Sequence, residues 1–340
     1  SLLLLSMPLL LAQVPKKILI EEATQASCAP CASVNPGFDA IISSNIDKMV
    51  PVKYQVWWPG YDPMYEENPL EVNARIQTLG PTSTGGLIAP GMYANLGQMV
   101  NAGTLTQAMV DQMAALTSPI SMTVEHTLND ADGTVDIEVS ITNESASDIA
   151  ANNYRLMVAV QEDTMEYASP PGTNGEMEFH WVMRKFVPDP NGTALTSAIG
   201  AGETVNFTFS QPIPWYTKDL SFVAVSAWVE NPNTREMLQA ERSTNKPLTG
   251  NFPDLAVSYL LAGYDGYCDD AVDITFDIRN DGEEEVTSFD VNAVLPDGSL
   301  QVINSWTGNI AVGGEEQVVI ADVPLAIGAN ALTATITNIN

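Results

Sequence analysis

The chain is poor in the groups on which most hydrolases and nucleic-acid-binding proteins depend. It has only two histidines and no Gly-x-Ser-x-Gly, which leaves little from which to build a Ser-His-Asp triad. Its many carboxylates include no pair whose spacing marks a glycosidase. Only 13 basic residues stand against 42 acidic ones, and the resulting formal charge of −29 argues against binding nucleic acid or anionic membranes.

Cysteine is equally scarce, with three in 340 residues. Cys28 and Cys31 have no second cysteine pair beside them, and only His126 and His180 could complete four ligands, so we expect no zinc site. The remaining Cys268 is either buried and inert or paired with a residue beyond the end of this chain.

The acidic stretches at 129–133 and 265–270 lack the alternating ligands and closing glutamate of an EF-hand loop, and hairpin turns explain them better. We therefore expect no metal and no other cofactor.

Long apolar runs are also missing. Residues 1–12, SLLLLSMPLLLA, are too few to span a bilayer and are typical of the apolar region of a signal peptide, with a cleavage zone near Ala12-Gln13. The run has no Met start and no basic flank, so we expect the first residues to be missing. The alternative is an ordinary buried segment at Leu9–Ala12. No cysteine follows the run, which argues against a bacterial lipid anchor. Export would place Cys28 and Cys31 in an oxidising compartment, where a disulfide persists.

The stretch Ile18–Ile42, ILIEEATQASCAPCASVNPGFDAII, is the best candidate for a functional site. An apolar run predicts a strand, and the pattern after Cys31 predicts a helix. Cys-x-x-Cys therefore falls at a helix N-terminus, where unpaired N–H groups favour a thiolate. Pro30 is tolerated in a first helical turn. This arrangement is what thiol–disulfide exchange requires.

This stretch resembles the active-site segment of the thioredoxin family. Pro30 and Pro36 match the proline of that family's Cys-Gly-Pro-Cys motif and its helix-kinking proline. Glu22 falls where thioredoxin has a buried acid, whose pKa should rise on burial. Gly86–Pro90 followed by Met92–Asn95 resembles the cis-proline loop, which implies that Pro90 faces the disulfide. Ser27 and Ala32 depart from the family pattern, at positions that affect partner choice and redox poise.

The resemblance implies four site residues: Cys28 as the attacking cysteine, Cys31 as the resolving cysteine, Glu22 as a proton relay, and the backbone at Ala89-Pro90 as the substrate-pairing edge.

After residue 117 the pattern becomes period-two alternation, typical of strands. Thr117-Ser118-Pro119 suggests a linker, and 246–252 suggests a second one. The segments EFHWVMRKFV and WVENPNTREMLQAE resemble the Omp28-related secreted proteins of Bacteroidetes, which join a thioredoxin-like domain to a β-sandwich. The last part resembles a CARDB-type immunoglobulin-like module. His180 and Arg184 in the first of these segments are better explained by packing than by a site.

We therefore expect a multidomain chain in which an α/β thioredoxin-like domain is followed by two all-β immunoglobulin-like sandwiches. The expected parts are a signal-peptide remnant at 1–13, the thioredoxin-like domain at 14–117, an Omp28-like sandwich at 118–247 and a truncated CARDB-like sandwich at 253–340. The resemblance implies a bacterial protein that is secreted or located at the cell surface in association with the outer membrane.

Two functions remain open. One is an exported thiol–disulfide oxidoreductase acting on protein disulfides. The other is a surface adhesion, filament or matrix protein in which the thioredoxin-like domain is a scaffold with a static disulfide; it would contact other cell-surface proteins or self-associate through open sandwich edges. Exposure of the Cys28 sulfur distinguishes them, because exchange needs access to the attacked sulfur.

Overall fold

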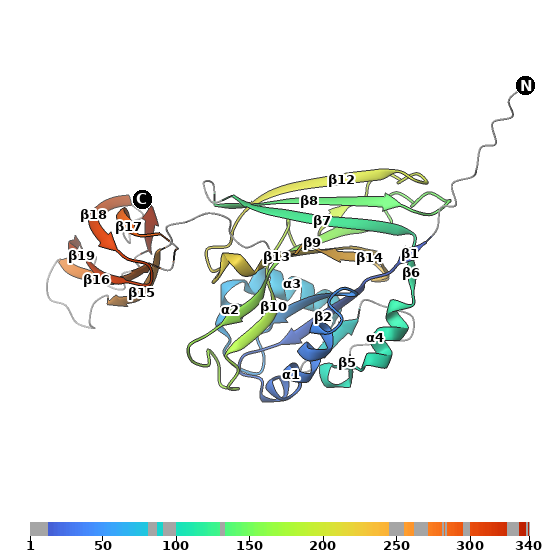
Figure 1. Ribbon diagram of the computed structural model, residues 1–340, viewed down its shortest axis with the longest axis horizontal. Coiled ribbons are helices and arrows are strands. Elements are labelled where there is room, and N and C mark those ends of the chain that lie inside the picture. Colours follow the sequence, from blue (N-terminus) through green and yellow to red (C-terminus); the bar gives the residue numbers. More distant parts are fainter. Residues whose placement is uncertain are drawn as a thin grey trace, which may run out of the picture. The chain divides into compact units, whose positions relative to one another are not determined.

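The computed structural model describes residues 13–80, 87–90, 100–129, 133–244, 255–261, 271–280, 282, 284–294, 300–324, 333–337 and 339 (Figure 1). They fall into two compact units, divided in the sequence between Leu248 and Thr249, and each unit is described by itself. Cys268, the first twelve residues and the whole of the expected second linker lie outside the described residues. None of the described helices is long and apolar enough to cross a bilayer.

The first unit opens with an α/β segment. Strand β2 pairs in parallel with β3, and α1 connects them. Every residue of β2 and β3 is buried, as expected for strands covered on both faces. Strand β4 pairs antiparallel with the other side of β2, and β5 pairs with β4. The elements are β2 (Ile18–Thr24), α1 (Ala29–Ser43), β3 (Met49–Gln55), α2 (Pro63–Glu67), α3 (Pro69–Leu79), β4 (Leu87–Pro90), β5 (Val100–Asn101), η1 (Ala102–Thr104) and α4 (Gln107–Ala114).

Local sequence explains where the helices begin and end. Cys28 caps α1 and Asp62 caps α2, each with a side chain that accepts backbone N–H groups of the first turn. Gly80 ends α3 in the left-handed conformation, with φ of 75°, which a residue without a Cβ adopts at little cost.

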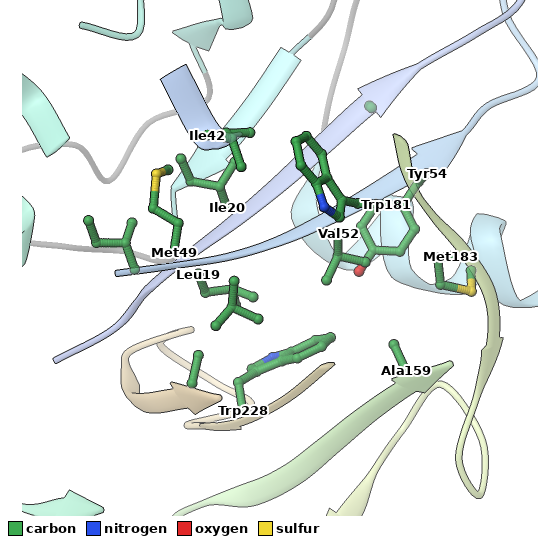
Figure 2. Close-up of a cluster of buried hydrophobic side chains, with 14 of the residues drawn as sticks. Leu19, Ile20, Ile42, Met49, Val52, Tyr54, Ala159, Trp181, Met183 and Trp228 are labelled. Atoms are coloured by element: carbon green, nitrogen blue, oxygen red, sulfur yellow. The ribbon is translucent and has the colours of Figure 1, made fainter. Parts of the chain in front are cut away.

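The β-rich segment that follows does not form a separate sheet from the α/β segment. Strand β10 pairs in parallel with β3 at Val182 and Lys53, so one nine-stranded sheet runs β14-β13-β9-β10-β3-β2-β4-β5, with β11 pairing with β9. Its additional strands are β9 (Arg155–Glu166), β10 (Glu178–Phe186), β11 (Thr193–Ala194), β13 (Val223–Glu230) and β14 (Met237–Arg242). Trp181 and Trp228 pack with Tyr54 in one core (Figure 2), so side chains from both segments share it.

A second sheet covers the β9, β13 and β14 part of the first (Figure 1). Its strand order is β12-β8-β7, formed by β7 (Ile120–Asn129), β8 (Thr134–Asn143) and β12 (Thr204–Pro212). Alternate residues of β7 and β8 are buried, because one face of this sheet packs on a core and the other meets water. A short 3₁₀ turn, η2 (Leu220–Phe222), precedes β13.

Buried ion pairs tie the two segments together. Arg75 on α3 donates hydrogen bonds from Nε and Nη2 to Glu21 on β2, and from Nη1 and Nη2 to Glu230 on β13. Tyr54 donates its hydroxyl hydrogen to Glu21, at 2.8 Å, and Arg155 on β9 also contacts Glu230. The network therefore spans both halves of the nine-stranded sheet.

One detail differs from the sequence-based expectation. Thr117-Ser118-Pro119 is not an open linker: β6 (Thr117–Ser118) pairs antiparallel with β1 (Val14–Pro15), and Ser118 is buried. Pro51 lies in β3, which has neighbouring strands on both sides. It is tolerated because β10 pairs with β3 only at Lys53, two residues further on.

The second unit contains two three-stranded antiparallel sheets, ordered β15-β16-β19 and β18-β17-β20. Phe276, Phe289 and Ile310 belong to its core, and Trp306 stacks on Phe289. The strands are β15 (Leu255–Leu261), β16 (Ala271–Asn280), β17 (Val286–Val294), β18 (Leu300–Ile310), β19 (Glu315–Pro324) and β20 (Thr333–Thr337). The chain is thus mostly β, with an α/β part and several sheets, as the sequence predicts.

Candidate functional site: a buried disulfide

Cys28 and Cys31 form a disulfide at the start of α1, with 5.2 Å between their Cα atoms. Cys28 is the residue that caps the helix, and its sulfur accepts the N–H of Cys31 at 3.2 Å. Pro30 lies in the first turn and Pro36 lies inside the helix. Both cysteines are buried, with exposed fractions of 0% and 1%, although their neighbours Ala29 and Pro30 are exposed.

A buried acid lies in the strand that leads to the disulfide. Glu22 pairs across β2 and β3 with Lys53, and 3.0 Å separates its Oε2 from the Lys53 Nζ. Lys53 also pairs with Asp39 on α1. Burial raises the pKa of Glu22 to about 7, and the Lys53 ammonium opposes this rise. Burial lowers the pKa of Lys53, but Glu22 and Asp39 outweigh that effect and the net pKa is raised.

The turn before α2 forms hydrogen bonds with residues 25–26, directly before the disulfide. Asp62 accepts the N–H of Ala26 at 2.7 Å, and Gln25 exchanges hydrogen bonds with the backbone of Gly60. Burial raises the pKa of Asp62 to about 6, although its bonds from backbone N–H groups oppose the rise. Trp57 is half-exposed in this turn and packs edge-on against Trp58.

Residues 167–177 connect β9 to β10 and are called the β9–β10 loop below; they form hydrogen bonds with the segment that leads into the disulfide. The N–H of Asn174 donates to the Ala26 carbonyl at 3.1 Å, and the N–H of Thr173 donates to the Ser27 hydroxyl at 3.1 Å. The Asn174 side-chain amide donates to the carbonyls of Gln25 at 3.1 Å and Cys28 at 3.3 Å.

Gly172 lets the β9–β10 loop approach this closely. A Cβ at this position would lie 2.2 Å from the carbonyl oxygen of Ala26, a distance that no side chain tolerates. The loop is therefore fitted to the backbone directly before Cys28.

The same loop contributes a second acid to this region. Glu176 accepts the side-chain N–H of Asn35 at 2.7 Å, and Asn35 also donates to the Thr24 hydroxyl. Burial raises the pKa of Glu176, and the hydrogen bonds from Asn35 and Asn174 oppose the rise. Glu176 in turn contributes to the raised pKa of Glu22. The loop thus interacts electrostatically with the acid in β2.

Of the four residues expected at the site, Cys28 and Cys31 are bonded together, and Glu22 is buried in the strand leading to them. Pro90 is placed elsewhere along β2: it pairs opposite Ile20, whereas Leu87 pairs opposite Ala23, nearer the disulfide. Three residues of strand correspond to roughly 10 Å. The structure does not bring Pro90 to the disulfide end of β2, and its role in pairing with a substrate stays a prediction.

Lys53, Asn174 and Glu176 were not predicted from the sequence as residues of the site. Lys53 had a signal, because it is a lone cation in the apolar run MVPVKYQV, and a buried cation needs a buried partner. Nothing local marks Asn174 or Glu176, which lie more than 140 residues from the backbone and side chains that they contact. His180 packs on Trp181, and Arg184 pairs with Glu162 and Glu67. The described residues contain no cluster of His, Cys, Asp and Glu suited to a metal ion.

Comparisons with known proteins show likeness in fold alone. No protein-family model and no curated protein matches the chain. Among solved structures, HBP35 of Porphyromonas gingivalis is similar over 91% of this chain and 99% of its own, with a TM-score of 0.52 and 14% identity. A protein of Agrobacterium tumefaciens is similar over 71% of this chain and 100% of its own, with a TM-score of 0.44 and 12% identity.

A third similar structure is a domain of the outer membrane lipoprotein Omp28 from Porphyromonas gingivalis. It covers 39% of this chain and 92% of its own length, with a TM-score of 0.27 and 14% identity.

Proposed function

We propose that the chain is an exported protein of the bacterial cell surface or exterior whose α/β part is a thioredoxin-like scaffold with a closed structural disulfide. The observation that carries the proposal is the burial of both cysteines, directly after a segment that the β9–β10 loop holds by hydrogen bonds. A disulfide is reduced only when a thiolate reaches one of its sulfurs, so a covered pair is a poor exchange site.

The thioredoxin-like assignment is supported by the connections around the disulfide. The cysteines follow β2 and open α1, and the local strand order is β3-β2-β4-β5 with β4 antiparallel to β2. The fold likeness to HBP35 over nearly the whole of both chains is consistent with this assignment. Export is supported by the apolar residues 1–12 and by the disulfide itself, which persists in oxidising compartments.

A scaffold role also fits the way in which the chain is built around the site. The β9–β10 loop connects two strands of the nine-stranded sheet that contains β2 and β3. It is hydrogen-bonded to three consecutive residues before the disulfide: the carbonyls of Gln25 and Ala26 and the side-chain hydroxyl of Ser27. This stabilises one geometry of the loop, whereas an exchange enzyme must admit another polypeptide. Other cell-surface proteins are the partners that such a scaffold would contact.

The test is the accessibility of the disulfide in the folded protein. We expect Cys28 and Cys31 to stay oxidised under mild dithiothreitol and to resist alkylation, while the same chain unfolded in urea is reduced and alkylated rapidly. Rapid reduction of the folded protein, together with reduction of insulin that a Cys28→Ser variant lacks, would overturn the scaffold proposal in favour of exchange.

Thiol–disulfide exchange is the second candidate, and the buried Glu22 favours it. An acid with a pKa of about 7 can take up and release protons near neutral pH. In this alternative the β9–β10 loop opens and the reduced Cys28 thiolate attacks a substrate disulfide, releasing one substrate thiolate. Cys31 then attacks the Cys28 sulfur, which releases the second substrate thiolate and restores the disulfide. Glu22 accepts the Cys31 proton.

The two candidates predict different effects of a Glu22→Gln substitution. If the chain exchanges disulfides, Glu22→Gln slows resolution of the mixed disulfide and flattens its pH dependence around pH 7, and Cys31→Ser traps the intermediate. If the chain is a scaffold, no mixed disulfide forms in either variant.

A further inference from the structure

Strand β12 is an open edge of the second sheet of the first unit. All nine of its residues pair with β8, and no described strand pairs with its other side (Figure 1). Its outer edge therefore presents backbone N–H and C=O groups that a further strand could pair with. Natural proteins usually protect such edges with charged side chains, proline or a bulge.

Strand β12 has none of these protections along its length. Its sequence, TVNFTFSQP, contains no charged residue although the chain has a formal net charge of −29, and its one proline is the last residue of the strand. The register with β8 is regular, without a bulge. Val205, Phe207 and Phe209 pack toward the core but remain partly exposed. By contrast, the edge strand β14 carries Glu241 and Arg242.

We propose that β12 pairs antiparallel with β12 of a second copy of this chain, around a two-fold axis at Phe207. In this register Phe207 faces its own equivalent, Val205 faces Phe209, and Asn206 faces Thr208. Facing residues then have the same parity, so the apolar side chains of both strands lie on the inner face and the polar ones on the outer face. Two three-stranded sheets become one six-stranded sheet.

The outer face is suited to this pairing because neutral hydrogen-bonding groups meet across the axis. Thr204 faces Ser210, and Asn206 faces Thr208. The Asn206 side chain accepts a hydrogen bond from Ser140 on β8 at 2.7 Å, and its NH₂ group donates no hydrogen bond to a described residue. That group is exposed and can donate to the Thr208 hydroxyl of the second copy.

The nearest acids do not oppose one another in this arrangement. Asp136 and Glu138 lie on β8, opposite Ser210 and Thr208 of their own copy. In the proposed register, Asp136 lies in line with Thr142 on β8 of the other copy, and Glu138 lies in line with Ser140 there, so neither acid is aligned with another acid. Like-charge repulsion is therefore small where the copies meet, and self-complementarity selects a second copy over an unrelated strand.

The test uses two variants that differ only in the sign of one charge. Asn206→Lys/Thr208→Lys places two lysine pairs directly opposite each other in the proposed register, whereas Asn206→Glu/Thr208→Lys places two Glu–Lys pairs there. Both variants place the new lysine at position 208 opposite Glu138 on β8, and both substituted positions are exposed, so the fold should tolerate both. Circular dichroism melting checks this.

Analytical ultracentrifugation of the whole chain over a concentration series measures the dimer. We expect the wild-type chain to dimerise, the Glu/Lys variant to dimerise at least as tightly, and the Lys/Lys variant to dimerise about tenfold more weakly than the Glu/Lys variant, or not at all. Amide hydrogen exchange at 205–209 should slow at high concentration in the wild type and in the Glu/Lys variant.

A wild-type chain that stays monomeric at all concentrations would overturn the proposal. So would equal dimerisation of the two variants, or a dimer in which exchange at 205–209 is unchanged, because each result would place the contact elsewhere. If the Lys/Lys variant fails to fold, the exchange protection of the wild-type and Glu/Lys dimers still decides the question.

Discussion

Replacing Asn174 by alanine should expose the disulfide without disturbing the sheet. The Asn174 side chain bridges the β9–β10 loop to the carbonyls of Gln25 and Cys28, at 3.1 and 3.3 Å. Its carbonyl oxygen also accepts the N–H of Glu176, at 2.9 Å. The substitution removes these bonds but leaves the loop's backbone contacts to Ala26 and Ser27 in place.

The expected size of the effect follows from the two bonds that cross to the disulfide loop. Each intramolecular hydrogen bond contributes about 0.5–1.5 kcal/mol net, so losing two lowers the free energy of local opening by about 1–3 kcal/mol. Since about 1.4 kcal/mol corresponds to a factor of ten, the open population rises about 5- to 140-fold. When opening and closing are fast, the rate of reduction follows that population.

The assay is the rate at which dithiothreitol reduces the Cys28–Cys31 disulfide, followed by alkylation and mass spectrometry. Thr173→Ala is the matched control, because Thr173 contacts Ser27 through its backbone N–H, which the substitution keeps. We expect Asn174→Ala to be reduced about 5- to 140-fold faster and Thr173→Ala to behave like the wild type. If both variants match the wild-type rate, the loop does not control access to the disulfide.

Three further predictions concern buried charges. Arg75→Met leaves the carboxylates of Glu21 and Glu230 buried and should lower the free energy of unfolding by about 3–5 kcal/mol in urea titrations; Arg155→Met, at the more exposed end, should cost less. Burial raises the pKa of Glu230, but Arg75 and the hydrogen bonds to Glu230 outweigh this effect and hold the pKa at about 2. Ionised Glu230 therefore stabilises the folded protein above pH 4.5, its ordinary pKa, and this stabilisation is lost as the pH falls toward 2. In urea titrations over this pH range, Glu230→Gln should remove this dependence. Burial raises the pKa of Glu22 from 4.5 to about 7. As the pH rises across that interval, the free energy of unfolding of the wild type should fall by up to about 3 kcal/mol relative to that of Glu22→Gln. A difference in melting temperature between the two proteins that stays constant over this pH range would contradict the assignment.

Much of the fold could be predicted from periodicity alone. Alternation in Thr134–Thr142 and Thr204–Ser210 predicts strands that the structure extends by one or two residues. The helix that begins after Cys28 was also predicted from its sequence pattern. The joining of the two segments into one sheet could not be predicted, because it depends on a single parallel register between β10 and β3, at Val182 and Lys53. No local pattern encodes a contact between strands so far apart in the chain.

Only the part of the site that lies in the stretch Ile18–Ile42 could be predicted. The disulfide, the buried Glu22 and the helix that the cysteines open all lie within one short stretch, where spacing and residue type carry the information. The loop that holds the segment before Cys28 lies beyond residue 166, and its fit depends on Gly172 and Asn174. Those residue types are ordinary in any loop, so their role appears only once the strands are arranged in space.

The contacts at the base of the β9–β10 loop determine which bonds must break for the loop to open. The base of the β9–β10 loop is closed by the Tyr167 N–H, which donates to the Met177 carbonyl at 2.8 Å, and by the edge-on contact of Tyr167 with Phe179. Strand β10 then pairs with β3 at Lys53, the residue that holds Glu22. An opening that breaks only the contacts of 172–176 leaves this pairing intact, and it is opposed by a few hydrogen bonds rather than by the sheet. It also removes Glu176 from the neighbourhood of Glu22. Because Glu176 raises the pKa of Glu22, opening should favour ionisation of the acid in the strand that leads to the disulfide.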